Sequence, residues 1–504
     1  MDLLLTSFGN VFHPSVMLVI AMGVAVGITV GALPGLTATM GVALLVPLTF
    51  GRPPLESLAM LLGLYCGAMY GGSIAAILVR TPGTPAAAAT VLEGYPMAQR
   101  GEAGRALAMA LFASFSGGLT GALVMTFLSP LISTVALEFS TVEYFALAVF
   151  GLSVIVSISG KSIVKGLMTG IFGLLISTIG ADPISGFPRF IFGQMDLFEG
   201  PPFIPTLIGL FAVSEVLANV QAQQSLVRVK AVVDRYLPSW ADIKASAVAI
   251  VRGSLLGTMI GAIPGAGGDI AAFVSYGETK RTSKHPEKFG TGQVEGLAAS
   301  ECANNACSGG AMIPLLSLGV PGDAVTAVLL GAFVIQGLQP GPLLYKDHID
   351  IVYNVFASMI VANFAMLAIG LVGIRLFAKV ILVRRAILMP SILVLSIVGA
   401  YAMRRDVFDV YFMLGCGVGG YFLQKHDFPL SPILLALILG PMAEANLRRS
   451  LVVSGGDFGI ILTRPIAVAL LVLAVGSLVA GFYNHRKIAR RLAQQQPPGE
   501  APPE

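Results

Sequence analysis

The chain has 504 residues, of which 55% are hydrophobic and only 12% are charged, and its mean hydropathy is +0.84. Soluble domains carry about 25% charged residues, so this composition excludes a soluble protein. The formal net charge of +4 comes from Lys and Arg in short loops, where they set membrane orientation, and it does not indicate nucleic-acid binding. Apolar stretches long enough to cross a bilayer recur along the chain and predict an all-α polytopic membrane protein.

These stretches predict about 10–12 transmembrane helices, since a span needs about 20 residues. In chain order the predicted embedded segments are 16–50, 55–80, 103–128, 142–159, 161–180, 202–220, 246–277, 297–319, 324–344, 351–382, 387–403, 407–423, 430–442 and 465–484. The segments 16–50 and 246–277 are too long for one simple span, and each contains a Pro-Gly pair that interrupts a helix. The N-terminus lacks the basic region of a signal peptide, so the first apolar segment is expected to be a membrane element.

Basic loops predict the orientation of the chain, because Lys and Arg accumulate on the cytoplasmic side. The strongest are 228–244, 280–288, 485–491 and the group Arg375, Lys379, Arg384 and Arg385. The C-terminus is therefore expected in the cytoplasm, where 221–245 forms an amphipathic linker. With 228–244 and 280–288 on one side, 246–277 is predicted to be a re-entrant hairpin; a broken spanning helix is the alternative. The polar, Pro-rich tail 485–504 is predicted to be disordered.

An internal repeat divides the chain. Residues 23–35 align without gaps to 253–265 with six of 13 positions identical, against about one expected by chance at common residue frequencies. Downstream, 71–85 resembles 309–324 with a one-residue insertion. We therefore predict a first transmembrane repeat unit over 1–220 and a second over 246–484. The loop after the first break holds one Arg and its counterpart holds four Lys or Arg, which favours inverted repeats.

Each repeat carries two Pro-Gly breaks, and the breaks predict a transport site. Pro removes a backbone donor and Gly permits positive φ. At membrane depth the freed groups survive only inside protein or beside a solvated cavity. A half-helix that begins after a break directs its N–H groups toward that cavity, where a carboxylate can bind, and freed carbonyls can hold a cation such as sodium. A single break would indicate a plain kink.

The candidate site residues lie at these breaks and on one polar helix face. The predicted substrate-binding residues are Pro34, Gly35, Thr37, Thr39, Ser73, Pro82, Gly83, Thr84, Pro264, Gly265, Gly267, Gly268, Asn304, Asn305, Pro321 and Gly322. The candidates for a coupling ion are Asp269, Glu301, Ser308 and Asp323. The face arises because Glu301, Asn304, Asn305 and Ser308 recur at helical spacing, and ionisable groups within a membrane usually face a cavity. A structural hydrogen-bond network is the alternative for this face, and helix capping is the alternative for the two aspartates.

Other patterns predict close packing, and for the cysteines metal ligation is the alternative. Glycines spaced four apart, namely Gly23, Gly27, Gly31, Gly253, Gly257 and Gly261, predict close helix packing. The cysteines Cys66, Cys302, Cys307 and Cys416 have no metal-ligand spacing and are expected to be packed thiols. A structural ion-pair network is predicted for Glu444, Arg448, Arg449, Asp457 and Arg464, with partner docking as the alternative.

The chain resembles the large membrane subunit of the tripartite tricarboxylate transporters in three stretches, 31–51, 70–101 and 295–342. The C-terminal pattern matches as well, with "GPMAEANLRRS" followed by "GGD" and "RP" near 440–465. The resemblance covers nearly the whole chain except 485–504. It implies a bacterial inner-membrane permease that imports carboxylates, driven by a sodium or proton gradient rather than ATP. It also implies two partners, a periplasmic substrate-binding protein and a small four-helix membrane subunit, and no cofactor. Citrate, other tricarboxylates, dicarboxylates and aromatic acids all remain open as substrates.

The leading hypothesis is cation-coupled carboxylate uptake by alternating access between the repeats. A passive anion channel is the alternative, although duplicated hairpins do not favour a pore lined by rings of side chains. An intramembrane enzyme is not expected, because the sequence contains no GxSxG motif, HExxH motif or matching acid pair.

Overall fold

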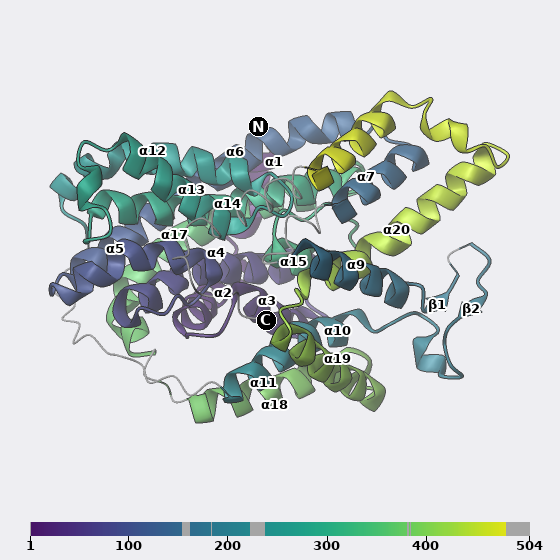
Figure 1. Cartoon of the computed structure of the whole chain (residues 1–504), viewed down its shortest axis with the longest axis horizontal. Helices are drawn as coiled ribbons and strands as arrows, with labels where there is room; N and C mark the ends of the chain where they lie inside the picture. The colour runs from purple at the N-terminus through teal and green to yellow at the C-terminus, as the bar shows by residue number, and fades with distance from the viewer. Residues whose placement is uncertain are drawn as a thin grey trace, which may run out of the picture. The chain divides into compact units, whose positions relative to one another are not determined.

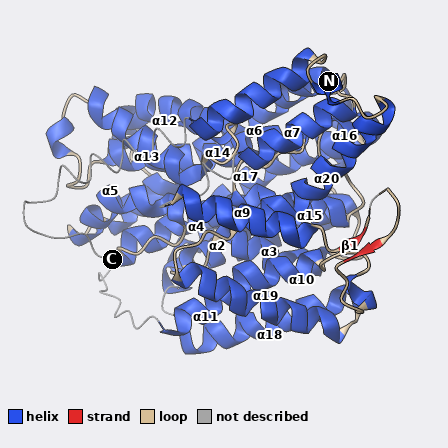
Figure 2. Ribbon diagram, turned by 45° about the vertical axis from the view of Figure 1, so that its right-hand side comes forward, coloured by secondary structure: helices blue, strands red, loops and turns tan. Residues whose placement is uncertain are grey.

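The computed structural model describes residues 2–153, 162–182, 184–221, 237–380, 383 and 385–479. These residues are almost entirely helical, as Figure 2 shows, and the predicted all-α fold is confirmed. The chain forms two compact units: Met1–Glu138 with Pro202–Lys425, and Phe139–Pro201 with His426–Glu504. Each predicted repeat contributes residues to both units, so the units of packing differ from the predicted repeat units. Most of the predicted linker, 222–236, and the predicted disordered tail lie outside the described residues.

The first unit contains both pairs of predicted breaks. Its elements are α1 (Asp2–Val11), α2 (Pro14–Ala32), α3 (Ala38–Thr49), α4 (Pro54–Val79), η1 (Pro85–Ala87), α5 (Ala88–Gln99), α6 (Ala103–Ala136), α10 (Phe203–Ile208), η3 (Gly209–Val213), α11 (Ser214–Gln221), α12 (Trp240–Gly261), α13 (Gly267–Thr282), η4 (Pro286–Lys288), α14 (Val294–Leu318), α15 (Ala324–Ile335), α16 (Pro342–Asp347), α17 (Ile349–Val380), α18 (Arg385–Arg404) and α19 (Val407–Lys425). Figure 1 labels most of these elements.

The second unit is smaller. Its elements are α7 (Thr141–Ser153), α9 (Ile163–Ser177), the short antiparallel strands β1 (Gly180–Ala181) and β2 (Pro188–Arg189), η2 (Met195–Leu197), α20 (Ser431–Val453), η5 (Phe458–Ile461) and an apolar helix over Pro465–Val479. Among the described residues of the whole chain, seven helices are long and apolar enough to cross a membrane, and six shorter apolar helices accompany them. The chain is therefore a multi-pass membrane protein by length and composition.

Both overlong segments are interrupted where the sequence predicted. The chain leaves helix between α2 and α3 and again between α12 and α13. Gly35 and Gly265 have φ values of +90° and +79° at these points, a conformation that favours glycine. α12 and α13 run back along each other as a helical hairpin. Gly253 of α12 faces Ser275 of α13, and a Cβ on Gly253 would lie 2.6 Å from Ser275 Oγ. Figure 1 shows this hairpin beside α14.

Two predicted segments have different extents in the structure. The segment 324–344 was predicted as one embedded element, but α15 already ends at Ile335. Gly337 then turns the chain with φ +74°, and the short α16 follows. The predicted segment 430–442 is shorter than the helix observed there, since α20 continues to Val453. The stretch 202–220 is one continuous helix with a π-helical turn at η3.

The glycine spacing places helix backbones in direct contact, as predicted. A Cβ on Gly31 of α2 would overlap the carbonyl oxygen of Ala68 on α4. In the second copy, a Cβ on Gly261 of α12 would lie 2.6 Å from the carbonyl oxygen of Cys307 on α14. Any side chain at these positions would force the helices apart. The α2–α4 and α12–α14 pairs are thus built in the same way.

The structure also corrects the alignment of the two copies. Gly71–Gly72 had been matched to Gly309–Gly310, which required an inserted residue before the second break. In the structure Gly71 faces the Ile28 carbonyl on α2, and Gly310 faces the Thr258 carbonyl on α12. Gly71 therefore corresponds to Gly310, and one constant shift in residue number continues through α4 and α14 to the breaks. No insertion is needed.

The long helix of each copy packs on the central helix of the other copy. α6, which follows the first pair of breaks, packs along α14, and α17, which follows the second pair, packs along α4. The contact is again through small residues: a Cβ on Gly117 of α6 would overlap the Cys302 carbonyl on α14. Each copy therefore supplies the long helix that covers the central helix of the other.

In the second unit, α20 packs on α7 and α9 and carries an ion-pair network. Arg189 Nη1 lies 2.7 Å from Glu444 Oε1, and Arg448 Nη1 lies 2.5 Å from Asp182 Oδ2. Glu444 and Arg448 are predicted members of such a network, while their partners, Asp182 in the β1–β2 loop and Arg189 on β2, are not. Asp457 instead caps η5 through the Gly459 N–H.

Candidate functional site

The predicted breaks meet in two pairs inside the first unit, and each pair combines both repeats. α13, which follows Pro264–Gly265, packs on η1, which follows Pro82–Gly83. α3, which follows Pro34–Gly35, packs on α15, which follows Pro321–Gly322. The glycines of three breaks are buried and Gly35 is half-buried. Within the second repeat the two breaks also touch, since the Gly265 N–H donates to the Gly322 carbonyl at 2.7 Å.

The α3–α15 contact is closed by the chain's own side chains. Thr37 is the N-cap of α3, and its hydroxyl accepts from the Met40 N–H at 3.1 Å. Asp323 is the N-cap of α15 and forms a capping box with Thr326. The other carboxylate oxygen of Asp323 accepts from the Tyr65 hydroxyl at 2.6 Å. We call this set, Thr37, Tyr65 and Asp323, the capped junction. The capping alternative for Asp323 is thus confirmed.

The α13–η1 contact lacks such caps. The N-cap of α13 is Ala266, whose methyl side chain cannot accept a hydrogen bond, and Thr84, the N-cap of η1, makes no capping bond. A Cβ on Gly268 would lie 2.9 Å from both Asn304 Oδ1 and Met69 Cε, and 3.3 Å from Ala86 Cβ. Thr84 lies at the start of η1, which contacts α13 and α14, and its Oγ1 is 2.5 Å from the position of a Cβ on Gly72 of α4. We call this set, Gly267, Gly268, Thr84, Asn304, Met69 and Ala86, the open junction.

Two polar atoms of the open junction have no partner. Asn304 Nδ2 donates to the Met69 carbonyl at 3.3 Å, but Asn304 Oδ1 has no hydrogen-bond partner among the described residues. Thr84 Oγ1 has none there either. The side chains of Asn304 and Thr84 are 0% and 3% exposed. Buried polar atoms are nearly always paired in folded proteins, so these two atoms are available to bind a ligand or a water molecule.

The two junctions are copies of each other. The shift in residue number that relates Gly83 to Gly322 also relates Thr84 to Asp323 and Tyr65 to Asn304. In one copy Tyr65 and Asp323 are joined by a hydrogen bond, and in the other Asn304 Oδ1 and Thr84 Oγ1 have no partner among the described residues.

The caps differ in the same way. The shift that relates Gly35 to Gly265 relates the capping Thr37 to Gly267, which has no side chain. The capped junction is therefore closed by its own side chains, whereas the open junction lacks the corresponding caps.

Glu301 lies about one helical turn before Asn304 on α14, in a cluster of hydroxyl groups. Its carboxylate is fully buried and accepts from Ser73 of α4 at 2.5 Å, from Ser114 of α6 at 2.9 Å, and from Thr90 of α5. Ser73, predicted to bind substrate, is thus bonded to Glu301. A carboxylate surrounded by hydroxyl oxygens has the hard oxygen donors that bind sodium, and it can also carry a proton. No cluster of three or more His, Cys, Asp or Glu occurs among the described residues.

The other predicted residues have more local roles. Asn305 Nδ2 donates to the Glu301 carbonyl at 3.3 Å, and the Ser308 hydroxyl donates to the Asn305 carbonyl at 2.6 Å, so both bond to their own helix. Thr39 is buried within α3, and Asp269 is exposed in the first turn of α13. The predicted polar face therefore divides: Glu301 and Asn304 reach other elements, whereas Asn305 and Ser308 do not.

Glu93 was missed by the sequence analysis. It lies on α5, is fully buried, and accepts from the N–H groups of Gly290, Gly292 and Gln293 at 2.6, 2.7 and 2.7 Å. Its carboxylate also accepts from the Tyr276 hydroxyl of α13 at 2.7 Å. The side chain ties α5 of the first repeat to the loop between α13 and α14 of the second. An acid inside the small-residue stretch 86–98 was the available signal.

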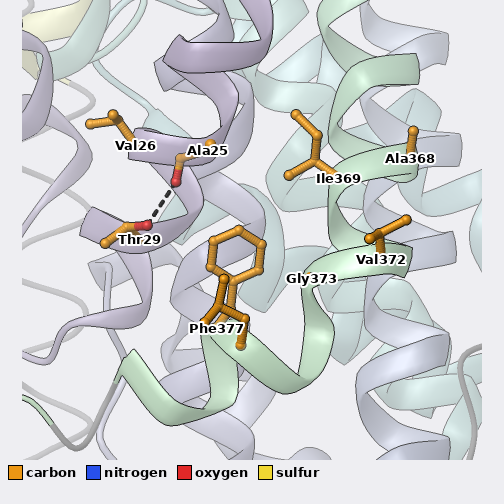
Figure 3. Close-up of a pocket in the computed structure, with 9 residues that line it drawn as sticks. Ala25, Val26, Thr29, Ala368, Ile369, Val372, Gly373 and Phe377 are labelled. Carbon is orange, nitrogen blue, oxygen red and sulfur yellow. Dashed lines mark hydrogen bonds between the residues drawn. The ribbon is translucent and has the colours of Figure 1, made fainter.

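A hollow of about 660 Å³ lies elsewhere, between α2 and α17 (Figure 3). It is lined by Ala25, Val26, Thr29, Ala368, Ile369, Val372, Gly373, Leu376 and Phe377. The only polar side chain in this lining is Thr29, and its hydroxyl already donates to the Ala25 carbonyl at 2.8 Å. Val372 is 89% exposed, so the hollow opens outward. With no charge and no free polar group, it cannot recognise a carboxylate.

The fold and these junctions define a polytopic, all-α membrane protein whose broken helices meet in its interior, an arrangement that recurs in membrane transporters. Residues 17–435 match the tripartite tricarboxylate transporter TctA family, and the chain belongs to that family. It is 40% identical over 459 residues, 91% of each chain, to a protein of Agrobacterium vitis described as an uncharacterized 52.8 kDa protein in the TAR-I ttuC' 3' region. An uncharacterized protein in the TAR-II ttuC' 3' region of the same organism is 37% identical over 219 residues, which are 44% of this chain and 90% of that protein. No solved structure matches the chain.

Proposed function

We propose that the chain is the large permease subunit of a tripartite, binding-protein-dependent secondary transporter that imports carboxylates across a bacterial inner membrane. The observation that carries the proposal is the meeting of half-helix starts from both repeats at buried junctions, in a chain of the TctA family. Half-helices that start at membrane depth are a recurring means of binding anionic substrates in secondary transporters. A periplasmic substrate-binding protein would deliver the substrate, a small four-helix subunit would complete the membrane complex, and the C-terminus would face the cytoplasm. The chain would have no enzymatic activity.

The substrate carboxylate would bind at the start of α13. The first N–H groups of this helix have no acceptor within the helix, and they carry the positive end of its dipole. Among the described residues, no side chain accepts from the N–H groups of Gly267 or Gly268. Backbone donors hold an anion without a Lys or Arg charge, so the empty site costs less than a buried cation would.

The coupling cation, sodium or a proton, would bind at Glu301. Burying a carboxylate with only neutral partners is unfavourable, and a cation offsets this cost. Cation binding would turn the lone pairs of the Ser73, Thr90 and Ser114 oxygens toward the ion and reorient their hydroxyl protons. Thr90 lies on α5, the helix that continues η1. Occupancy of the cation site would in this way be coupled to the position of the open junction.

Alternating access would then require η1 and α5 to separate from α13. Glu93 opposes this separation on one side of the junction, because it holds α5 against the loop that follows α13. The crossed packing of α6 and α17 would remain as the frame around which the broken elements move.

Uptake by proteoliposomes tests the proposal. The chain is reconstituted with the small subunit and supplied with the binding protein, and uptake of radiolabelled carboxylates is followed with and without an imposed sodium or proton gradient. Accumulation above the external concentration must require a gradient and the binding protein. Equilibration without a gradient would identify a passive anion channel instead.

A further inference from the structure

We propose that the open junction selects carboxylates that carry a hydroxyl group beside the carboxylate, with Asn304 and Thr84 recognising that hydroxyl. This inference rests on the proposed function, and it names the substrate class and the residues that would distinguish it. It comes from the difference between two junctions that are otherwise copies.

The orientation of the Asn304 amide determines what it can bind. Nδ2 donates to the Met69 carbonyl, a group that only accepts, so Oδ1 must be the atom that faces Gly268. An amide oxygen can only accept hydrogen bonds. Any ligand that satisfies Asn304 must therefore supply a donor, and an ionised carboxylate has none.

The start of α13 offers hydrogen-bond donors and therefore requires an acceptor from the ligand. The N–H groups of Gly267 and Gly268 only donate, so they fit a carboxylate oxygen. Gly268 is the same residue whose missing side chain leaves Asn304 Oδ1 beside the backbone. A ligand at this point meets donors from the backbone and an acceptor from α14, and a carboxylate next to a hydroxyl satisfies both.

Thr84 supports the same ligand from the first repeat. Its hydroxyl can donate and accept, and it lies beside Gly72 of α4, where a Cβ would be 2.5 Å from Thr84 Oγ1. The residue is buried, and Oγ1 has no partner among the described residues. In the capped junction the corresponding positions hold Asp323 and Tyr65, which bond to each other. The chain thus fills one junction with its own hydroxyl and carboxylate, the same pair of groups that a hydroxy acid would bring to the other.

An ammonium group is the other donor that a ligand could offer to Asn304, but the open junction does not favour it. A buried ammonium needs an opposite charge nearby. The buried side chains around Gly268 are Asn304, Met69 and Ala86, and none is acidic. The nearest acid is Asp269, whose Oδ1 lies 2.7 Å from the position of a Cβ on Gly267. Its side chain is exposed to solvent, so it does not supply the buried opposite charge that an ammonium group at Gly268 would need. A neutral hydroxyl is therefore the better match.

Matched pairs of acids test the proposal on the purified, full-length chain. The probes are citrate and propane-1,2,3-tricarboxylate, 2-hydroxysuccinate and succinate, and mandelate and phenylacetate; each pair differs by one hydroxyl. Binding is measured by isothermal calorimetry in detergent. In at least one pair the hydroxylated acid should bind about tenfold or more tightly, since an unmade hydrogen bond to a buried group is expensive.

Two variants then assign the preference to the junction. Asn304→Leu and Thr84→Val should each reduce the ratio within the preferred pair to about threefold or less by removing one hydrogen-bonding group, with a smaller effect on the acid that lacks the hydroxyl. Ser317→Ala is the matched control on α14, because its hydroxyl donates to the Ile313 carbonyl of its own helix. It should keep the wild-type ratio. Size-exclusion chromatography and thermal unfolding identify any variant that fails to fold, and the two variants lie in different repeats.

Three results would overturn the inference: equal affinity within every pair, an unchanged ratio in both folded variants, or no binding of any probe. Uptake in the reconstituted system separates this failure from that of the proposed function. Gradient-driven uptake of both members of a pair at equal rates would leave the transporter intact and remove the hydroxyl selectivity. Loss of gradient dependence for all carboxylates would instead contradict the proposed function.

Discussion

The Tyr65 hydroxyl on α4 donates a 2.6 Å hydrogen bond to Asp323 at the start of α15, and so joins the two predicted repeats. Both side chains are buried, and Asp323 also caps α15. The corresponding residues of the other junction, Asn304 and Thr84, make no such bond among the described residues. The contrast shows that a duplicated membrane unit can keep its geometry while only one of its two junctions retains free polar groups.

Tyr65→Phe should destabilise the protein. It removes a hydrogen bond to a buried carboxylate, for which we expect a cost of roughly 1–3 kcal/mol. Thermal unfolding in detergent measures the effect as a lower midpoint. Tyr411→Phe is the control, since Tyr411 is 71% exposed. Equal midpoints for the two variants would show that the Tyr65–Asp323 bond contributes nothing to the fold.

Glu301→Gln should change the coupling-ion requirement. A glutamine keeps the shape but loses the charge, and its NH₂ group cannot accept from the hydroxyls that surround Glu301. Uptake should lose its dependence on sodium or on pH while the protein stays in the membrane. Glu138→Gln, at an exposed position, is the control. Unaltered sodium and pH dependence in Glu301→Gln would make Glu301 a structural residue.

Glu93→Gln should loosen the loop between α13 and α14. The carboxylate accepts from the N–H groups of Gly290, Gly292 and Gln293, and replacing one oxygen by a donor should cost roughly 2 kcal/mol or more. Limited proteolysis should cut this loop faster than in the wild type. Glu138→Gln, at an exposed position, is the control and should leave the cleavage rate unchanged. Equal rates in the two variants would show that Glu93 does not hold the loop.

Gly322→Val and Gly265→Val should abolish uptake without preventing membrane insertion. A Cβ on Gly322 would lie 2.5 Å from the Ala311 Cα and 2.7 Å from the Gly261 carbonyl oxygen, which leaves no room for a side chain. Gly265 has positive φ, which a β-branched residue adopts only under strain. Gly277→Ala, on α13 with nothing within 4 Å, should transport normally. Normal uptake in both valine variants would remove the breaks from the site.

The loop between α9 and α10 should become less stable in acid. The Ser185 N–H, the Arg448 guanidinium and the Ile184 N–H hold the pKa of Asp182 below its ordinary value. A lowered pKa stabilises the fold above the unfolded value of about 3.9, and the contribution is lost as the pH falls through the folded pKa. Proteolysis of this loop should therefore be faster in Asp182→Asn than in the wild type at pH 7, and the difference should shrink below about pH 4. A difference independent of pH would contradict the prediction.

Local patterns made much of the fold predictable. The Pro-Gly pairs interrupt α2–α3 and α12–α13 because their effect on a helix depends on the residues themselves. The four-residue glycine spacing likewise specified which helix faces approach closely. The extent of α15 was overestimated because 336–344 reads as apolar, although its glycines and Pro340 end the helix.

The pairing of the breaks was not predictable from one sequence. Which half-helix meets which depends on the crossed packing of α6 and α17, and no local pattern encodes this contact. Thr84 and Asp323 both look like helix caps, yet only Asp323 caps its helix. Thr90 and Ser114 were missed for the same reason: a hydroxyl in an apolar helix usually bonds to its own backbone, and only the fold shows that these two reach Glu301.

The exchange of long helices between the two copies has a consequence for how the protein is made. α4 is fully enclosed in the finished structure, and one of the helices that enclose it, α17, lies near the other end of the chain. During synthesis α4 must wait in the bilayer, or with the insertion machinery, until most of the polypeptide has left the ribosome. A nascent chain released before α17 would leave the side of α4 that carries Cys66, which contacts Met359 and Asn363 of α17, open to lipid and to membrane proteases. The central helix of the first copy is therefore covered only after the second copy has been inserted.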